Sequence, residues 1–326
     1  MDAPPEGQPP PSPWEQAGLS QQEFPAGLYV VATPLGNAAD VTLRALWVMR
    51  LADCIACEDT RTSAPLLARY GIHRPLLALH RHNEERAAGP VLERLAQGQR
   101  VALVSDAGTP AISDPGALLV RACLASGFRV IPIPGASAMT AALCVAGVRS
   151  AAVHFAGFAP ARGSARRRHW EALAALDGAL VLLEAPHRIA AAAREIRETF
   201  AQDRRVVIAR ELTKRFETVV QTDVGALPGA IEQAGARGEY VLIIDAAQDA
   251  APPDGGAGEG AATLDAATAK WLRALASELP ASQAAALAAK ASGLPRELLY
   301  DFLVKARAKA SPALPQGRDR GGRRGS

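Results

Sequence analysis

Three charged side chains lie where predicted strands end and could take part in proton transfer. Glu58 follows the apolar run "CIAC", Glu184 ends the run "ALVLLE", and Lys214 lies three residues after Glu211 in "RELTKRFE". A carboxylate or a neutral lysine close to a hydroxyl group can accept its proton, which accelerates such reactions by roughly 10²–10⁴-fold. The sequence leaves open which of the three candidates would be the base.

Each candidate also has a purely structural alternative. Glu58 belongs to "CEDTR", where Asp59 follows it and Arg61 could form an ion pair with it. His187 in "EAPHR" could belong to the first turn of a helix, and Lys214 could simply hold a phosphate group. Because these charged residues gather at the ends of strands that are themselves apolar, we favour a shared site over solvated surface positions.

The stretch "SDAGTPAISDPG", from Ser105 to Gly116, is longer than a connection needs to be. It follows the apolar run "RVALV", and most connections in compact domains have only a few residues. Gly108 permits backbone conformations that other residues avoid, and we predict Asp114 and Pro115 as the N-cap and first position of the next helix. Such a loop can present backbone N–H and C=O groups to a flat polar ligand such as an adenosine; a long surface loop is the alternative.

Two further loops have a similar character. In "VVATPLGNAAD" a strand is followed by a turn shaped by Pro34 and Gly36, and Asp40 is placed to cap a helix. In "IPIPGASAMTAA" a helix opens with small residues that let a ligand approach the backbone, although tight packing explains them equally well. Ligands bind where the strands of an open parallel sheet end. Neither a G-x-G-x-x-G nor a Walker lysine pattern is present, which disfavours dinucleotide and nucleoside triphosphate binding.

The histidines and cysteines do not predict a metal site. His80 and His82 in "HRHNEE" have no third ligand at a suitable spacing, so RNA contact or plain surface is the better interpretation. The C-x-x-C pair falls in a predicted strand, where residues three apart point to opposite faces. We expect all four cysteines to be buried, inert thiols: Cys54, Cys57, Cys123 and Cys144.

The composition is that of a globular protein. The chain has 326 residues, of which 49% are hydrophobic and 21% charged, with a formal net charge of +3. No apolar run approaches the ~20 residues of a membrane helix, and the proline-rich, acidic N-terminus does not resemble a signal peptide. We therefore expect a cytoplasmic protein without a membrane segment.

The order of apolar runs predicts two domains and a helical module. Short strands alternate with amphipathic helices in the first part, which is typical of an α/β layer with a parallel sheet, whereas strands outnumber helices in the second, mixed α+β part. A linker rich in Pro, Gly and Ala precedes helices with breaks at Pro280 and Gly293, a helix-turn-helix-like pattern. The predicted segments are a disordered leader (1–26), an N-terminal α/β domain (27–149), a second α+β domain (150–246), a linker (247–263), a small C-terminal helical module (264–309) and a basic disordered tail (310–326).

Two groups of arginines could bind phosphate groups. The stretch "PARGSARRRHW" carries Arg166, Arg167 and Arg168 in a predicted loop, and phosphate contacts supply most of the sequence-independent affinity for nucleic acids. The C-terminal tail adds Arg318, Arg320, Arg323 and Arg324. A solvated start of a helix is the alternative for the first group.

Taken together, these segments resemble the tetrapyrrole methylase superfamily of S-adenosylmethionine-dependent enzymes, and within it the branch that methylates ribosomal RNA. The resemblance extends in order over "LYVVATPLGNAADVTLRAL", "ACEDTR", "LHRHNE", "VALVSDAGTPAISDPG", "VIPIPGASA", "FAGFAP", "EAPHR", "ARELTKRFE" and "GEYVLII". It implies a two-domain fold, S-adenosylmethionine as methyl donor, no metal, and 16S rRNA of the small ribosomal subunit as partner. The implied reaction is 2′-O-methylation of the ribose of the decoding-site cytidine 1402, by a homodimer.

The resemblance also assigns residues. The implied donor-binding residues are Pro34, Gly36, Asp106, Ala107, Gly108, Thr109, Ile112, Ser137, Ala138, Phe158, Ala185 and Pro186. The candidates for contact with RNA are Arg61, His82, Arg166, Arg167, Arg168, His187 and Arg188. Two other functions remain open: C-methylation of a tetrapyrrole by the same fold, and a non-catalytic RNA-binding factor of ribosome assembly.

Overall fold

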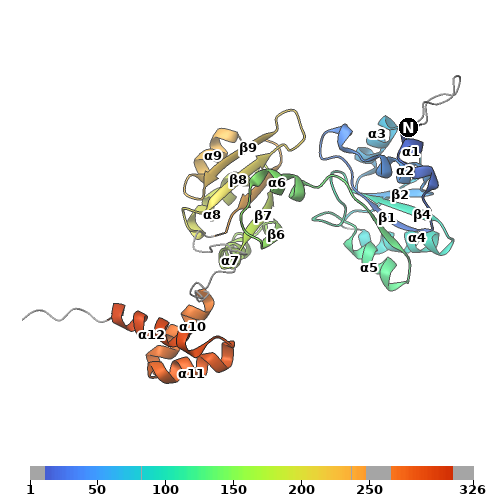
Figure 1. The fold of residues 1–326 in the computed structure, drawn as a ribbon. Coiled ribbons are helices and arrows are strands. Elements are labelled where there is room, and N and C mark those ends of the chain that lie inside the picture. Colours follow the sequence, from blue (N-terminus) through green and yellow to red (C-terminus); the bar gives the residue numbers. More distant parts are fainter. Residues whose placement is uncertain (1–11, 82, 236, 247–265, 311–326) are drawn as a thin grey trace, which may run out of the picture. The chain divides into compact units, whose positions relative to one another are not determined.

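The computed structural model describes residues 12–81, 83–235, 237–246 and 266–310 (Figure 1). The chain divides into two compact units, residues 1–253 and 254–326. The first unit contains two five-stranded sheets and the second contains helices. This organisation confirms the predicted fold class of a parallel first sheet, a mixed second sheet and a C-terminal helical module.

The first sheet is entirely parallel. Its strand order is β3-β2-β4-β1-β5, and each neighbouring pair runs in the same direction. The strands are β1 (Gly27–Val31), β2 (Cys54–Cys57), β3 (Leu76–Ala78), β4 (Arg100–Val104) and β5 (Val130–Ile133). Since parallel strands all end at the same edge, the loops after β1, β2, β4 and β5 meet there.

Helices cover both faces of the first sheet, and the cysteines of β2 mark the two faces. Cys57 packs in one apolar cluster with α2 and α3, whereas Cys54 packs in another with α4 and α5. The two thiols therefore point in opposite directions, as predicted. The helices are α2 (Leu43–Leu51), α3 (Thr60–Arg69), α4 (Glu84–Ala96) and α5 (Ala117–Ala125), with the short 3₁₀ helix η2 (Ala38–Asp40) before α2.

The second sheet is mixed, with order β6-β7-β10-β8-β9. Only β6 and β7 pair in parallel; the other neighbours are antiparallel. Alternate residues of its inner strands enter two separate apolar clusters. The strands are β6 (Val153–Phe158), β7 (Ala179–Glu184), β8 (Arg205–Arg210), β9 (Thr218–Asp223) and β10 (Tyr240–Ile244).

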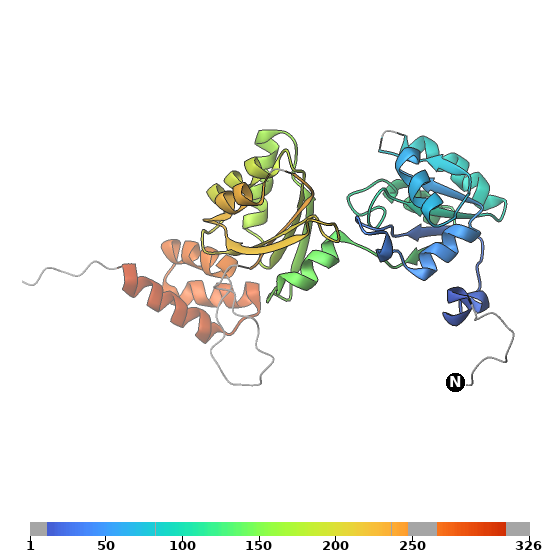
Figure 2. The same ribbon diagram turned by 90° about the horizontal axis from the view of Figure 1, so that it is seen from above.

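One helix lies on a different sheet from the one its sequence position suggests. The helices α7 (Gly163–Ala174), α8 (Ile189–Thr199) and α9 (Leu227–Ala234) cover one face of the second sheet, and α6 (Ala138–Ala146) covers the other (Figures 1 and 2). Ala142 and Ala146 of α6 are small enough to pack closely on Val181 and Val207. The predicted first domain, 27–149, therefore includes a helix, α6, that packs on the second sheet in the structure. Cys144, on the opposite side of α6, is exposed and not buried as expected.

The segment before β1 is folded from residue 12 onward. Ser12 and Glu15 form a reciprocal capping box at the start of α1 (Pro13–Gln16), and η1 (Leu19–Gln21) follows with Leu19 buried. The Phe24 ring contacts Tyr29 and Trp47 and lies beneath the guanidinium of Arg100. The prediction of a disordered leader over 1–26 is therefore wrong for residues 12–26, because these apolar anchors outweigh the effect of the prolines. Residues 1–11 lie outside the described residues.

The second unit is a three-helix cluster. Helices α10 (Ala266–Glu278), α11 (Ala281–Ser292) and α12 (Arg296–Ala310) share a core of leucine and alanine side chains that includes Leu272 and Leu299. Helix α11 starts directly after Pro280 and ends at Gly293, which has a left-handed φ of 73°, so both predicted breaks are confirmed. The predicted linker and basic tail lie outside the described residues, apart from the last residue of α12. In the described part of the chain, no helix has the length and apolarity to cross a membrane.

A buried carboxylate fixes the start of α5 and so the end of the loop 105–116. Glu84, at the first position of α4, is only 7% exposed. One of its oxygens accepts hydrogen bonds from the backbone N–H groups of Gly116, Leu118 and Leu119 at 2.9, 2.7 and 3.4 Å. A negative charge at a helix N-terminus is favourable because the N–H groups there have no partner within the helix. Glu84 therefore caps α5 from outside it.

We expect Glu84→Ala to lower the free energy of unfolding by about 2 kcal/mol, because it leaves buried N–H donors without an acceptor. Glu85→Ala is the matched control, since Glu85 occupies the same turn but is exposed. Urea unfolding followed by circular dichroism measures both variants. Equal losses in the two variants would show that Glu84 has no special role as a cap.

Candidate functional site

Two loops at the carboxyl edge of the first sheet are joined by backbone hydrogen bonds. The N–H of Thr33, after β1, donates to the carbonyl of Gly108 at 2.8 Å, and the N–H of Gly108 donates to the carbonyl of Thr33 at 3.0 Å. The Thr33 hydroxyl donates to the carbonyl of Ser105 at 3.0 Å. This bridge gives the loop 105–116 a fixed position against the end of β1.

The loop 105–116 has an unusual backbone. Gly108, Ala111, Ser113 and Gly116 have φ angles of 78°, 65°, 66° and 126°. Two of these residues have side chains, and a non-glycine residue in the left-handed region costs roughly 1–3 kcal/mol unless its surroundings hold it there. Such strain is concentrated at functional sites. The excess length noted in the sequence therefore corresponds to a shaped loop.

A cavity of about 460 Å³ lies beside this loop, between the strand ends of both sheets. The predicted donor-binding residues 106–109, Ile112, Ser137 and Ala138 line it from the loops of the first sheet. Phe158 and residues 184–186 line it from the second sheet. Glu58 also lines it. The structure thus brings together residues that are far apart in the sequence.

Two predicted donor-binding residues do not line this cavity. Pro34 is buried and Gly36 is exposed, and the intervening Leu35 contributes to the wall instead. Gly36 has a different role, because a Cβ added to it would lie 2.3 Å from the Cγ of Lys214. Glycine at this position allows the lysine chain to cross the loop after β1.

Asp114 and Glu239 line the cavity although the sequence analysis did not assign them to the site. Asp114 was predicted as an N-cap, but the N-cap of α5 is Gly116 and the capping carboxylate is Glu84. Asp114 does not cap the helix and lies instead at the cavity wall. The two prolines and the length of the loop were the available sequence signal, since a simple helix start needs neither.

The cavity is rich in carboxylates whose charge is poorly compensated. Burial, together with the nearby charge of Glu58, raises the pKa of Asp114 from 3.8 to about 6. Burial and the neighbouring Asp106 raise the pKa of Glu58, and burial raises the pKa of Asp106. Arg81 partly offsets the repulsion at Glu58 and Asp114. A cationic ligand would be favoured here, because it would relieve this repulsion.

Glu184 presents an unsatisfied oxygen at the same cavity. The side chain is 3% exposed, and its Oε1 accepts a hydrogen bond from the Ala185 N–H at 2.9 Å and an ion pair from Arg188 at 3.2 Å. Its Oε2 has no partner among the described residues. Burial raises the pKa of Glu184, which Arg188 opposes. A buried acceptor without a partner is costly, so this oxygen destabilises the fold beside the cavity.

Lys214 is held as a cation and does not line the cavity. Its Nζ lies 3.1 Å from an oxygen of Glu211 and 3.0 Å from an oxygen of Glu239. Burial lowers the pKa of Lys214, but the hydrogen bonds with Glu239 and Glu211 outweigh burial and raise the pKa overall. Glu211 and Thr213 also have left-handed φ angles, of 52° and 66°. These ion pairs disfavour a neutral lysine that could act as a base. The Lys214 side chain instead contacts the loop at Gly36 while its amine is held by residues of the second sheet.

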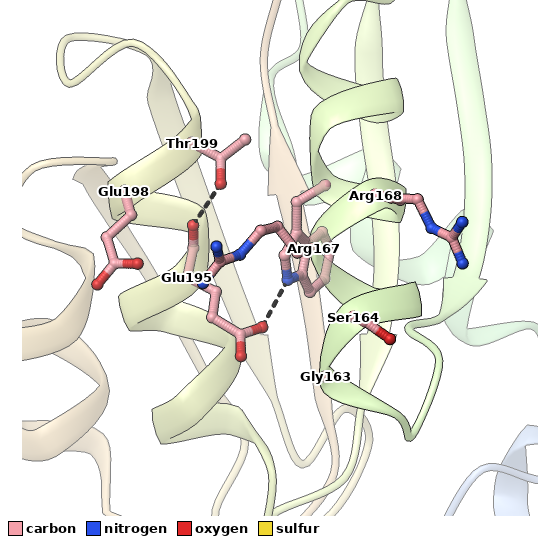
Figure 3. A pocket seen from close by; sticks show the side chains of 8 residues that line it. Gly163, Ser164, Arg167, Arg168, Glu195, Glu198 and Thr199 are labelled. Atoms are coloured by element: carbon pink, nitrogen blue, oxygen red, sulfur yellow. Dashed lines mark hydrogen bonds between the residues drawn. The ribbon is translucent and has the colours of Figure 1, made fainter.

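The arginine cluster divides into one structural and two exposed side chains. Arg166 donates to Glu195 at 2.6 Å, and the indole N–H of Trp170 donates to the same carboxylate at 2.8 Å, so Arg166 ties α7 to α8. Arg167 and Arg168 are exposed, and Arg168 points away from α8 (Figure 3). The expectation that all three contact RNA therefore fails for Arg166, whose charge is already paired inside the fold.

A second, larger cavity lies beside these arginines. It has a volume of about 670 Å³ and is lined by residues of α7 and α8, including Arg167, Trp170 and Glu198 (Figure 3). Neither a strand end nor a strained loop contributes to it. We therefore place the donor site in the cavity at the strand ends, not here.

The other predicted RNA contacts are scattered. Arg61 has an 88% exposed side chain and pairs with Asp59 at 2.7 Å, His187 is exposed, and Arg188 donates to the carbonyls of Ala159 and Pro160 as well as pairing with Glu184. His82 lies outside the described residues. Across the ranges that the structure describes, no three His, Cys, Asp or Glu side chains gather as a metal site.

Sequence comparison identifies the family to which this fold and cavity correspond. Residues 27–228 match the family described as Tetrapyrrole (Corrin/Porphyrin) Methylases, and residues 262–307 match the RsmI C-terminal HTH domain. The chain belongs to the tetrapyrrole methylase family of S-adenosylmethionine-dependent methyltransferases, in the branch that carries this C-terminal domain.

Its relatives within the family share one name. The ribosomal RNA small subunit methyltransferase I of Neisseria meningitidis serogroup B is 44% identical over 85% of this chain and 92% of its own length. The protein of the same name from Xylella fastidiosa is 45% identical over 85% and 98%, and that from Pseudomonas aeruginosa is 42% identical over 87% and 98%.

Solved structures confirm the fold. The methyltransferase CobJ has a TM-score of 0.52 at 21% identity and covers 68% of this chain and 95% of its own. The cobalamin biosynthetic enzyme cobalt precorrin-4 methyltransferase, CbiF, has a TM-score of 0.50 at 19% identity, with 67% and 94% covered. At this identity the likeness concerns the fold alone.

We expect Asp114→Asn to stabilise the protein at pH 7 by roughly 1 kcal/mol, an amount reduced by the partial exposure of the side chain. The folded-state pKa of Asp114 is about 6 against an ordinary 3.8. The folded protein therefore binds the extra proton in this range, and the wild-type protein loses stability as the pH rises from about 4 through 6. The gain of the variant should vanish near pH 4. Urea midpoints at both pH values test this, and a gain independent of pH would contradict it.

Proposed function

We propose that the protein transfers a methyl group from S-adenosylmethionine to the ribose 2′-hydroxyl of the decoding-site cytidine in 16S rRNA of the small ribosomal subunit. The observation that carries the proposal is the cavity at the strand ends, which the strained loop 105–116 lines from the first sheet and residues 184–186 line from the second. The names of relatives with 42–45% identity over nearly their full length support rRNA as the substrate class.

The residues of the cavity fit the donor. Bound there, the donor would supply a methyl group on a positively charged sulfur. Asp106 and Asp114 provide the negative potential that favours a cation. Gly108 and Ala138 put no bulky side chain into the cavity, and Glu184 supplies a carboxylate to the wall formed by the second sheet. Holding both reactants in line is the main contribution of such an enzyme and can supply roughly 7–11 kcal/mol.

The two alternative functions have less support. C-methylation of a tetrapyrrole would agree with the solved structures, but these are only about a fifth identical to this chain. A non-catalytic assembly factor would have no use for a strained loop and a buried carboxylate with an unsatisfied oxygen, because both cost stability. We therefore favour the rRNA methyltransferase.

The test is mass spectrometry of 16S rRNA from cells that lack the protein. We expect ribose methylation at the decoding-site cytidine to be absent, and to return with the wild-type gene but not with Gly108→Val. Valine is strained at φ 78°, and its Cβ would meet Leu35 at 3.2 Å, so donor affinity by calorimetry should fall at least tenfold.

Gly98→Val is the matched control for this experiment. Gly98 has a similar φ of 76° but open space around it, in the turn between α4 and β4. It should bear the same backbone strain and retain donor affinity and methylation. Unchanged methylation in the deleted strain would overturn the proposed function, and equal effects of the two glycine variants would overturn the placement of the donor site.

For RNA binding we expect the double variant Arg167→Ala, Arg168→Ala to weaken affinity and to reduce the slope of log affinity against log salt by roughly one to two, because each phosphate contact contributes nearly one. Arg166→Ala is the comparison, since Arg166 is paired with Glu195. It should lower stability and leave the slope unchanged. Filter binding between about 50 and about 300 mM salt measures the slopes, because over this range the affinity should change by roughly two orders of magnitude. A slope unchanged in the double variant would remove these arginines from the interface.

The resemblance further implies a homodimer that acts in the cytoplasm. The edge strand β9 supports self-association, because Val219 and Val220 on it are 43% and 44% exposed. Sedimentation velocity of the full chain decides between monomer and dimer.

A further inference from the structure

A third, smaller cavity adjoins the proposed donor cavity at the ends of β2 and β3. It has a volume of about 340 Å³ and is lined by residues 58–61 with Ala78, His80 and Asp106. Glu58 and Asp106 belong to the walls of both cavities. The two spaces therefore meet at these carboxylates, and a group held in one would face a group held in the other.

The smaller cavity has the chemistry of a hydroxyl-binding site, because the carboxylates of Glu58, Asp59 and Asp106 line it and accept hydrogen bonds from ribose hydroxyl groups but disfavour a phosphate among them. Thr60 brings a hydroxyl group and His80 an imidazole ring, and the guanidinium of Arg61 is 88% exposed at its rim. Hydroxyl, imidazole and guanidinium groups can bond to ribose oxygens as well. No apolar residue larger than Ala78 lines this cavity. It suits the ribose of an RNA nucleotide better than an apolar ligand.

The structure also distinguishes among the candidate bases. Glu184 is paired with Arg188, and Lys214 is held between Glu211 and Glu239. Asp106 accepts a hydrogen bond from the backbone N–H of Asp59 at 3.2 Å. Within the described ranges Glu58 takes part in no ion pair, although it is partly buried. Glu58 is thus the candidate without an ion pair that lines both cavities, and its charge is only partly offset by Arg81 and by the backbone of Asp106.

We propose that the smaller cavity receives the ribose of the target nucleotide, and that Glu58 is the catalytic base. This inference rests on the proposed function. As the hydroxyl oxygen forms its bond to the methyl carbon, its O–H bond breaks and the proton passes to the carboxylate of Glu58. The bond between methyl and sulfur breaks with its electron pair moving to sulfur, so a neutral thioether and a methyl ether remain.

Burial and the charges around Glu58 raise its pKa above the ordinary value of a glutamate. Burial raises its pKa, as do Asp106 and Asp59; the backbone N–H of Asp106 and the charge of Arg81 oppose them. Asp114, from the same loop as Asp106, also faces it. A base whose pKa lies closer to the working pH is the more effective one. The rate should therefore fall as the pH drops through this raised pKa, since the protonated acid accepts no proton.

The first experiment measures Glu58→Gln in the full chain under single-turnover conditions. We expect the methylation rate to fall by roughly 10²–10⁴-fold and its acidic limb to disappear from the pH profile. RNA affinity by filter binding should stay within about threefold, because glutamine keeps the size of the side chain. Donor affinity by calorimetry should fall by much less than the rate, because Asp106 and Asp114 still supply negative charge to the donor cavity. Glu85→Gln, at an exposed position of α4, is the matched control and should behave as the wild type.

The second experiment fills the smaller cavity. Ala78→Trp should raise the KM for RNA at least tenfold with donor affinity unchanged, whereas Ala68→Trp, at an exposed position of α3 outside both cavities, should change neither. A wild-type rate in Glu58→Gln would overturn the base, and an unchanged KM in Ala78→Trp would overturn the acceptor cavity. A wild-type enzyme that methylates no RNA would instead overturn the proposed function.

Discussion

The reciprocal backbone hydrogen bonds between Thr33 and Gly108 are the constraint on which the site depends. They join the ends of two neighbouring parallel strands and fix the position of Gly108, from which the loop to Gly116 continues. Glu84 then fixes the far end of that loop by capping α5. A loop held at both ends can keep Ala111 and Ser113 in left-handed conformations that a free loop would abandon.

Two contacts connect the elements of the first sheet with those of the second. Helix α6 leaves the last strand of the first sheet and packs on the second, so residues 137–138 line the cavity while the rest of the helix belongs to another core. On the opposite side, Lys214 crosses Gly36 and ends between Glu211 and Glu239. The first connection is apolar packing; in the second, the Lys214 chain lies against Gly36, while its ion pairs with Glu211 and Glu239 stay within the elements of the second sheet.

Much of this could be predicted from sequence, for identifiable reasons. Alternation of apolar runs predicted both sheets, and loop composition marked the loop 105–116 as a ligand loop, because strand ends and glycine positions are local signals. The resemblance to the family, and not the composition, suggested residues 106–109 and 184–186 as donor contacts. The failures concern distant partners. Nothing near Arg166 reveals that Glu195 neutralises it, and Asp114 resembles an N-cap unless Glu84 is known to occupy that role. Likewise, Ala142 was predicted to belong to the first domain, but it packs on the second sheet, which belongs to the predicted second domain.

The carboxylates gathered around the cavity bear on turnover as well as on binding. On the proposed function, Asp106 and Asp114 attract a sulfonium donor, yet the spent cofactor that remains after transfer is uncharged at sulfur. The electrostatic attraction that binds the sulfonium donor is therefore weaker for the spent cofactor, and the carboxylates again repel one another. Such a cavity would expel its own by-product without a separate conformational step, at the cost of a resting state less stable than its fold would allow.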